Sequence, residues 1–338
     1  MRKTLFGMFL ATFSVFLFTS CNNDQSIEQV QLSESSEFQA LDKQSFSEFC
    51  TSVDKINKEY YALYGIKSPS SRGVVRETLN HITGQTADKL GGVVGSWIGK
   101  RVGTAIGAAA GNPVTAVGGY VVGRWAGNKL GSAIASIGSA LVLNYAIDQI
   151  KGCTSGRRVK SISFDNPYYS DSIGSVHNRV MTEMLAKDSI YFTEKEELDF
   201  EKLYADCAKY IEEYDSEDAL LYTDSLFKAE MIAFCKDCCE LAEKGFREEI
   251  SQDTFLSEAI KLLEKYDVPK EDIELFTEYG IKVIEASGQI QEEKLEDYTN
   301  ELNQTICNSK LSEEQKAELS SATDLIINSG LVWRAMNE

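Results

Sequence analysis

Histidine, basic residues and familiar catalytic motifs are scarce or missing in this chain of 338 residues. Only 2 His are present, which argues against a histidine-rich metal site and against a histidine proton relay. Lys and Arg number 34 against 52 Asp and Glu, and the formal net charge of −18 argues against a nucleic-acid partner. The sequence has no phosphate-binding loop, no dinucleotide-binding glycine fingerprint, no HExxH and no GxSxG. We therefore expect no enzymatic activity, no metal and no cofactor.

The first residues have the pattern of an export signal. Two basic residues precede an apolar run from Leu5 to Phe18, and small residues stand directly before Cys21. The run is too short and wrongly flanked for a stable membrane span, so it predicts a targeting segment. Its end resembles a bacterial lipobox, with Phe18 where leucine is usual. The resemblance implies a signal peptide over 1–20 and a diacylglycerol and palmitate anchor on Cys21. The alternative is an ordinary secretory signal cut near the same point.

The residues after Cys21 indicate where such a lipoprotein would go. Asn22 follows the cysteine, where an Asp would retain it in the inner membrane, and this resembles the sorting of outer-membrane and surface lipoproteins of Bacteroidetes. An anchor with several acyl chains is enough for stable membrane attachment. Residues 21–37 are polar and without periodicity, which predicts a tether. We expect localisation at the outer membrane or cell surface.

Beyond the tether the sequence predicts an all-α protein in three parts. At 43 % hydrophobic residues the chain can bury a core. A stripe at helical spacing predicts a helix over 38–66, formed by Phe46, Phe49, Val53, Ile56 and Tyr60. A glycine-rich hairpin follows over 74–150, and an acidic multi-helix bundle over 160–338. In the bundle, helix starts are predicted by the capping boxes Thr193/Glu196 and Ser312/Gln315 and by Pro269.

Glycine recurs at every fourth position in two rows within the middle part. The rows are Gly91, Gly95, Gly99, Gly103, Gly107 and Gly111, and then Gly119, Gly123, Gly127 and Gly131. A spacing of four places each row on one helix face. Each Gly in a helix interior costs about 1 kcal/mol relative to Ala, so ten of them predict that a second backbone approaches the bare face. Because Gly111-Asn112-Pro113 predicts a stop and a turn, we expect two antiparallel helices with their glycine faces together.

The hairpin sequence resembles a known kind of envelope segment. The run from Val121 to Lys129, VVGRWAGNK, is similar to the glycine-zipper two-helix domains of bacterial envelope lipoproteins, and the glycine rows resemble glycine-rich helices of some bacteriocins. This resemblance covers the hairpin alone. It implies membrane association and self-packing, and it implies no catalytic activity.

Charge is segregated between the hairpin and the bundle. Residues 72–160 carry 11 basic and 3 acidic residues, net +8, whereas residues 161–338 carry 17 basic and 41 acidic residues, net −24. Charges at the centre of the first hairpin helix would each cost about 2.5–3.5 kcal/mol in a bilayer. We therefore expect a resting hairpin covered by protein rather than a static transmembrane pair. In an inserted oligomer, the basic side chains would line water or contact anionic headgroups. These are Lys100, Arg101, Arg124 and Lys129.

Two further groups invite a functional interpretation. Cys235, Cys238 and Cys239 share one helix face, but no nearby His or second CxxC completes a zinc site, so we expect core cysteines or a local disulfide. The stretch Asn166-Pro167-Tyr168 to His177 is similar to one in uncharacterised secreted bacterial proteins, which implies no activity. We expect His177 to be structural, and a hydrolase built around it is a third hypothesis.

The sequence as a whole predicts an envelope or surface lipoprotein whose cationic hairpin associates with or inserts into membranes, in a toxin-like manner after self-association. Its predicted partners are membrane lipid, including an anionic bilayer, and further copies of itself. The alternative is a structural or partner-binding lipoprotein in which the hairpin is a buried core element. On either hypothesis the sequence identifies no particular protein partner.

Overall fold

The computed structural model of the protein describes eight stretches of the chain. These are residues 35–65, 76–109, 113–146, 161–162, 173–185, 188–193, 197–214 and 219–337. Within them the protein is all-α, as predicted. There is no strand in these stretches, and one isolated antiparallel bridge joins Phe192 to Leu198. The chain divides into residues 1–44 and 45–338, and the packing below is that of the second unit.

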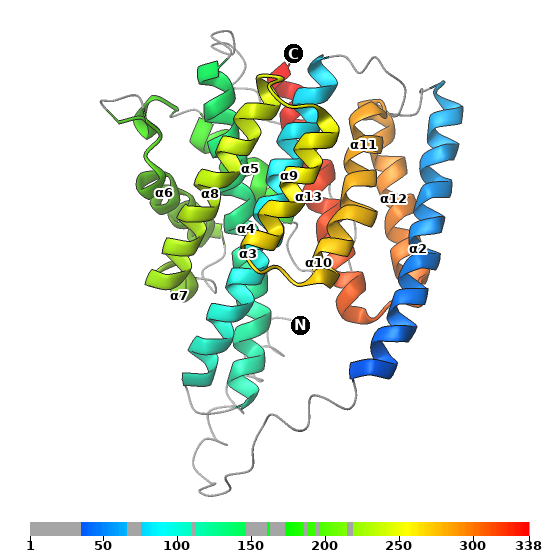
Figure 1. Cartoon of the computed structure of the whole chain (residues 1–338), viewed down its shortest axis with the longest axis horizontal. Coiled ribbons are helices and arrows are strands. Elements are labelled where there is room, and N and C mark those ends of the chain that lie inside the picture. Colours follow the sequence, from blue (N-terminus) through cyan, green and yellow to red (C-terminus); the bar gives the residue numbers. More distant parts are fainter. Residues whose placement is uncertain are drawn as a thin grey trace, which may run out of the picture. The chain divides into compact units, whose positions relative to one another are not determined.

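Twelve α-helices follow one another along the described stretches (Figure 1). They are α2 (Ser35–Leu63), α3 (Arg76–Ala109), α4 (Pro113–Ala146), α5 (Ile173–Leu185), α6 (Phe200–Tyr214), α7 (Ala219–Tyr222), α8 (Ser225–Phe246), α9 (Gln252–Lys265), α10 (Lys270–Leu275), α11 (Ile281–Gln289), α12 (Glu292–Asn308) and α13 (Glu313–Asn337). A 3₁₀ turn, η3, covers Asp188–Tyr191, and a π-helical turn, η5, covers Phe276–Gly280.

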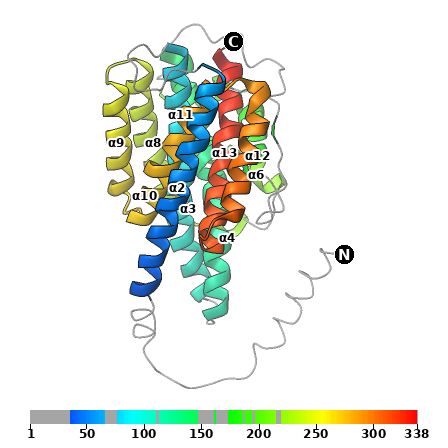
Figure 2. The same cartoon turned by 90° about the vertical axis from the view of Figure 1, so that its right-hand side faces the viewer.

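The antiparallel pair α3 and α4 is the centre around which the other helices pack. Helix α8 contacts both of them, α5 contacts α4, and α11 and α13 contact α3. One apolar cluster joins the pair to α5 through α9, and a second joins α2, α11, α12 and α13. In Figures 1 and 2 the lower ends of α3 and α4 extend beyond the helices that surround their upper parts. The hairpin is therefore buried over part of its length only.

The predicted stripe on the first helix is confirmed. Phe49, Val53, Ile56 and Tyr60 are buried in the second cluster, and Phe46 is half-buried against it. The rings of this stripe pack on aromatic residues of η5 and α12, with centroid distances of 5.5 Å from Phe49 to Tyr279 and 5.1 Å from Tyr60 to Tyr298. Residues 45–63 of α2 thus belong to the bundle rather than to the tether.

Two of the three predicted helix starts are confirmed. At α13, the Ser312 amide donates to Gln315 Oε1 and the Gln315 amide donates to Ser312 Oγ, both at 3.2 Å, which is a complete capping box. Pro269 directly precedes α10. The prediction at Thr193 was wrong, because the next helix, α6, begins only at Phe200. The Asp199 carboxylate caps that helix by accepting from the Lys202 amide at 3.0 Å.

Candidate functional site

The two glycine rows face each other in one antiparallel register. At each contact, a Cβ atom added to one glycine would overlap the carbonyl oxygen of its partner. The pairs are Gly91/Gly131, Gly95/Gly127, Gly99/Gly123 and Gly103/Gly119. Gly107 lies beyond the last pair, near Gly119, and Gly111 lies outside the described residues. The absence of side chains is therefore what allows the two backbones to touch, as the period of four predicted.

The hairpin has a covered part and an uncovered end. Residues 80–100 and 123–143 are buried except at Trp97, Trp125 and Val142, which are half-buried. We call residues 104–109 and 119–122 the hairpin end, and none of their side chains is buried. The exposed fractions there are 39 % for Ile106, 45 % for Val121 and 41 % for Val122. The sequence carries no charge from residue 102 to residue 123, so the hairpin end is an uncharged, partly apolar surface.

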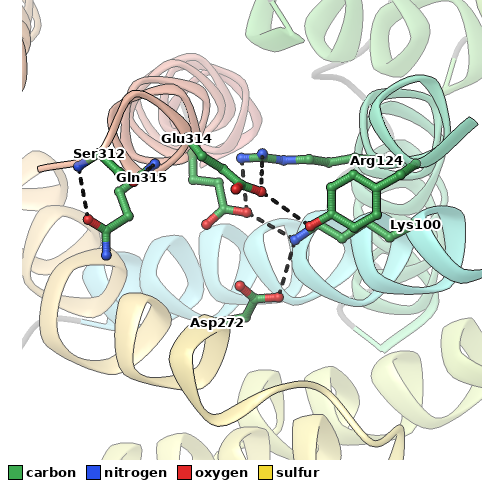
Figure 3. Close-up of polar contacts among 8 residues, drawn as sticks. Lys100, Arg124, Asp272, Ser312, Glu314 and Gln315 are labelled. Carbon is green, nitrogen blue, oxygen red and sulfur yellow. Dashed lines mark hydrogen bonds and ion pairs between the residues drawn. The ribbon is translucent and has the colours of Figure 1, made fainter. Parts of the chain in front are cut away.

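Directly behind the hairpin end, two basic side chains are held by acidic residues of the bundle (Figure 3). Lys100 Nζ lies 3.1 Å from Glu318 and 3.6 Å from Asp272, and Arg124 lies 2.9 Å from Glu318 and 3.3 Å from Glu314. We call these five residues the charged cluster. It joins α3 and α4 of the hairpin to α10 and α13, so its carboxylates neutralise the cations where the hairpin leaves the bundle.

Burial gives these ion pairs more weight than surface pairs. The side chains of Lys100 and Arg124 are only 7 % and 6 % exposed, whereas Glu314 is 58 % exposed. Removing one partner of a buried pair leaves an uncompensated charge, which is strongly destabilising. The Tyr120 hydroxyl donates to Glu314 Oε1 at 3.2 Å, and burial raises the pKa of this tyrosine. The hairpin cannot leave this contact without exchanging its carboxylates for water or other anions.

The four cations predicted to contact lipid headgroups differ in their placement. Lys100, Arg124 and Lys129 are buried in this arrangement. Arg101 is 41 % exposed, forms an ion pair with Glu230 of α8, and lies with its guanidinium carbon 5.5 Å from the centre of the Trp97 ring. In the resting fold, Arg101 is therefore the one of the four whose side chain reaches the surface.

His177 lies in the interior, in a polar contact between helices. Its Nε2 atom is 3.7 Å from the Asp88 carboxylate, and both side chains are fully enclosed. The same carboxylate accepts from Trp333 Nε1 at 2.7 Å and from the Ser329 hydroxyl. Desolvation raises the pKa of Asp88. This contact joins α3, α5 and α13, and its enclosure favours the structural interpretation of His177 over a hydrolytic one.

The three neighbouring cysteines lie in the core against the hairpin. Cys238 Sγ is 3.8 Å from the Ala87 carbonyl oxygen, and a Cβ atom at Gly138 would come within 2.6 Å of Cys239 Sγ. Burial raises the pKa of Cys239 to about 12, so this thiol is not poised to ionise. The described stretches contain no group of three or more His, Cys, Asp or Glu side chains placed to hold a metal ion. Cys21, the predicted lipid attachment site, lies outside them.

Sequence reasoning did not single out the partners of the hairpin's cations. They are Glu230, Asp272, Glu314 and Glu318. Residues 161–338 contain 41 acidic residues, and their local sequence does not distinguish those that pair with the hairpin from the others. The available signal was the spacing of four between Glu314 and Glu318, which places two carboxylates on one face of the helix that follows a capping box. That spacing marks a shared face but does not say what the face contacts.

None of the described helices combines the length and the apolar character needed to cross a membrane. Comparison with protein-family models, with curated proteins and with solved structures found no match.

Proposed function

We propose that the protein is a lipid-anchored lipoprotein of the bacterial envelope whose hairpin end contacts a membrane, while the acidic helices hold the cationic middle of the hairpin. The observation that supports this most directly is the hairpin end itself. It is free of charge, it presents Ile106, Val121 and Val122 to the surface, and it lies past the charged cluster. An uncharged tip on an otherwise acidic protein suits a partner that is itself apolar.

The dimensions of the hairpin end favour shallow contact over a membrane span. Residues 104–109 rise about 9 Å along the α3 axis, against the roughly 30 Å of a hydrocarbon core. Elements that lie in the headgroup region enter to a depth of about 5–10 Å. Trp97, Trp125 and Tyr120 stand half-buried near the base of the hairpin end, and Trp and Tyr favour the membrane interface. The resting protein would therefore dip into one leaflet.

Because of the charged cluster, deeper insertion of the hairpin should require an anionic membrane. An anionic membrane offers phosphates that compete with Asp272, Glu314 and Glu318 for the hairpin's cations. Lys100 and Arg124 leave their carboxylates only where those phosphates, or further copies of the hairpin, replace them. Full insertion after self-association is thus a second stage of the same proposal, and it should weaken steeply with added salt.

Vesicle binding by variants of the hairpin end tests the proposal. The double variant Ile106→Gln/Val122→Gln removes apolar surface without adding charge, and we expect it to lower binding of the full mature chain to vesicles about tenfold or more. The matched control is Leu220→Gln/Leu226→Gln on α7 and α8, since these leucines are 76 % and 58 % exposed. Flotation of phosphatidylglycerol-containing vesicles gives the measurement. Equal binding by the parent chain and both double variants would contradict the proposal.

The alternative function is a partner-binding lipoprotein with the hairpin as a core element, and the burial of residues 80–100 and 123–143 favours it. Gly99→Leu does not separate the two functions, because the backbones at Gly99 and Gly123 touch in the resting fold and either function needs that contact. The hairpin end does separate them. If the protein is a partner-binding lipoprotein, cells with the Ile106→Gln/Val122→Gln variant should have the same envelope phenotype as cells with the parent chain.

A further inference from the structure

A small, partly open cavity of mixed polar and apolar lining lies between the buried part of the hairpin and the helices that carry the charged cluster. It measures about 40 Å³ and is bounded by α3, α4, α10, η5 and α13. Its polar lining includes Lys89, Ser96, Asn128 and Ser321, and its apolar lining includes Val93 and Phe276. Since one water needs roughly 10–15 Å³ of such volume, the cavity admits a group of about three or four non-hydrogen atoms. The proposed contact with membranes makes no use of it.

Among the described residues, two buried groups around this cavity lack hydrogen-bond partners, and a third, Lys89, lacks a direct ion pair. Asn128 Oδ1 and Ser321 Oγ have no hydrogen-bond partner, although these residues are only 7 % and 2 % exposed. Lys89 is 7 % exposed, and among the described residues no carboxylate lies within ion-pair distance of it. Lys100 and Arg124, by contrast, have carboxylates within 3.1 Å. Asp272 offsets part of the cost of burying the Lys89 ammonium but makes no direct ion pair with it, so an anion beside Lys89 would be favourable.

We propose that this cavity binds a small carboxylate, with its charged oxygens on the Lys89 ammonium and the Ser321 hydroxyl. Asn128 presents either its oxygen or, after a half-turn of the amide, its NH₂ group. Asp272 and Glu318 also line the cavity, but these two carboxylates already contact two cations, Lys100 and Arg124. The π-helical turn at 276–280 forms part of the wall, and such turns recur at functional sites.

The titration of Lys89 gives the site a pH dependence. Burial lowers the pKa of Lys89 to about 8 from 10.5 in the unfolded chain, with Asp272 acting against this shift and Arg124 adding to it. The other groups that line the cavity with Lys89 are Glu318 of α13 and Tyr279 of η5. Burial raises the pKa of Tyr279, which stays neutral through this range. The carboxylate should therefore bind below pH 8 and dissociate as the pH rises above it.

Acetate is the probe for this site. It is titrated into the full mature chain by calorimetry in a chloride-free HEPES buffer. The fluorescence of Trp125, which lines the cavity, gives a second readout. Lys89→Met should weaken binding about tenfold or more and abolish its pH dependence. Lys261→Met on the exposed face of α9 is the matched control and should bind like the parent chain.

The Lys89→Met variant should also fold well. In the folded state the charge of Lys89 opposes folding below pH 8, and this penalty disappears as the pH rises toward 10.5. The variant should therefore have a higher Tm than the parent chain at pH 7 and lose that advantage near pH 10.5. Ser321→Ala gives an independent arm, because it removes a hydroxyl that has no partner in the fold. It should weaken acetate binding several-fold without lowering the Tm.

Two results would overturn the proposal. The first is no heat and no fluorescence change up to millimolar acetate, which indicates a cavity that holds only water. The second is equal acetate affinity in the parent chain and in both cavity variants, which places the binding elsewhere.

Discussion

The buried part of the hairpin and the hairpin end are built alike but are surrounded differently. Gly99 and Gly123 touch in the covered part of the hairpin, and Gly103 and Gly119 touch in the same way where the covering stops. The glycine contact thus continues past the helices that cover it. Formation of the hairpin and burial of the hairpin are separate properties, the first set by bare backbone faces and the second by what packs on the opposite faces.

The opposite faces explain where the covering stops. Along residues 80–100 the outer side of α3 meets buried apolar and polar partners such as Trp333, which contacts both the Asp88 carboxylate and the region of Gly84. From residue 104 to residue 109 no side chain is buried, and the charged cluster stands near this boundary. The covered part of the hairpin is therefore held in the bundle by specific polar and ionic contacts as well as by apolar burial.

The largest effect should come from breaking the glycine contact inside the bundle. Gly99→Leu places a side chain where the Gly123 carbonyl stands, and a backbone cannot give way as a side chain can. We expect a loss of about 3 kcal/mol or more in the free energy of unfolding, measured by urea denaturation followed by circular dichroism.

Ala108→Leu at the hairpin end is the matched control for that substitution. Its side chain is exposed, so it should change the free energy of unfolding by no more than about 0.5 kcal/mol. Similar losses in the free energy of unfolding for Gly99→Leu and Ala108→Leu would mean that the hairpin end is covered as tightly as the rest of the hairpin.

A smaller effect should follow from opening the charged cluster. Glu318→Gln removes the carboxylate that contacts both Lys100 and Arg124 and leaves two buried cations with fewer partners. We expect a loss of about 2–3 kcal/mol in the same measurement. Glu313→Gln lies on the same helix with a side chain that is 77 % exposed, and it should be close to neutral. A Glu318→Gln variant as stable as Glu313→Gln would show that the cluster contributes nothing to holding the hairpin.

Much of the fold was predictable because its signals are local and periodic. The register of the hairpin follows from the two glycine rows on either side of Asn112-Pro113, and the α13 start follows from two side chains three residues apart. Helix α4 begins at Pro113, within the predicted turn, because proline suits the first position of a helix. The pattern at Thr193 predicted a helix start wrongly: its hydroxyl accepts from the Glu197 amide at 3.3 Å, but residues 197–199 are not helical and Leu198 forms the bridge to Phe192.

The candidate sites were less predictable because they depend on contacts between distant elements. Lys89 carries no sequence signal of its own, and its importance comes from its burial without a direct ion pair among the described residues. The sequence also predicted all four hairpin cations as one group, whereas burial divides them. Lys100 and Arg124 have side chains that are nearly enclosed, and Arg101 is partly in solvent. Lys100 and Arg101 are neighbours on α3, and their burial differs because their side chains point in different directions.

The smallest effect should therefore come from Arg101, although it has the same charge as Arg124 and also contacts a glutamate. Water screens the pair between Arg101 and Glu230, whose side chains are 41 % and 28 % exposed. A double-mutant cycle with Arg101→Met and Glu230→Gln should give a coupling energy below about 1 kcal/mol that falls further with added salt. The same cycle on Arg124 and Glu318 should give a larger, less salt-sensitive value, because Arg124 is 6 % exposed. Equal couplings would mean that burial does not separate these cations, and that Arg101 holds the hairpin as firmly as the charged cluster does.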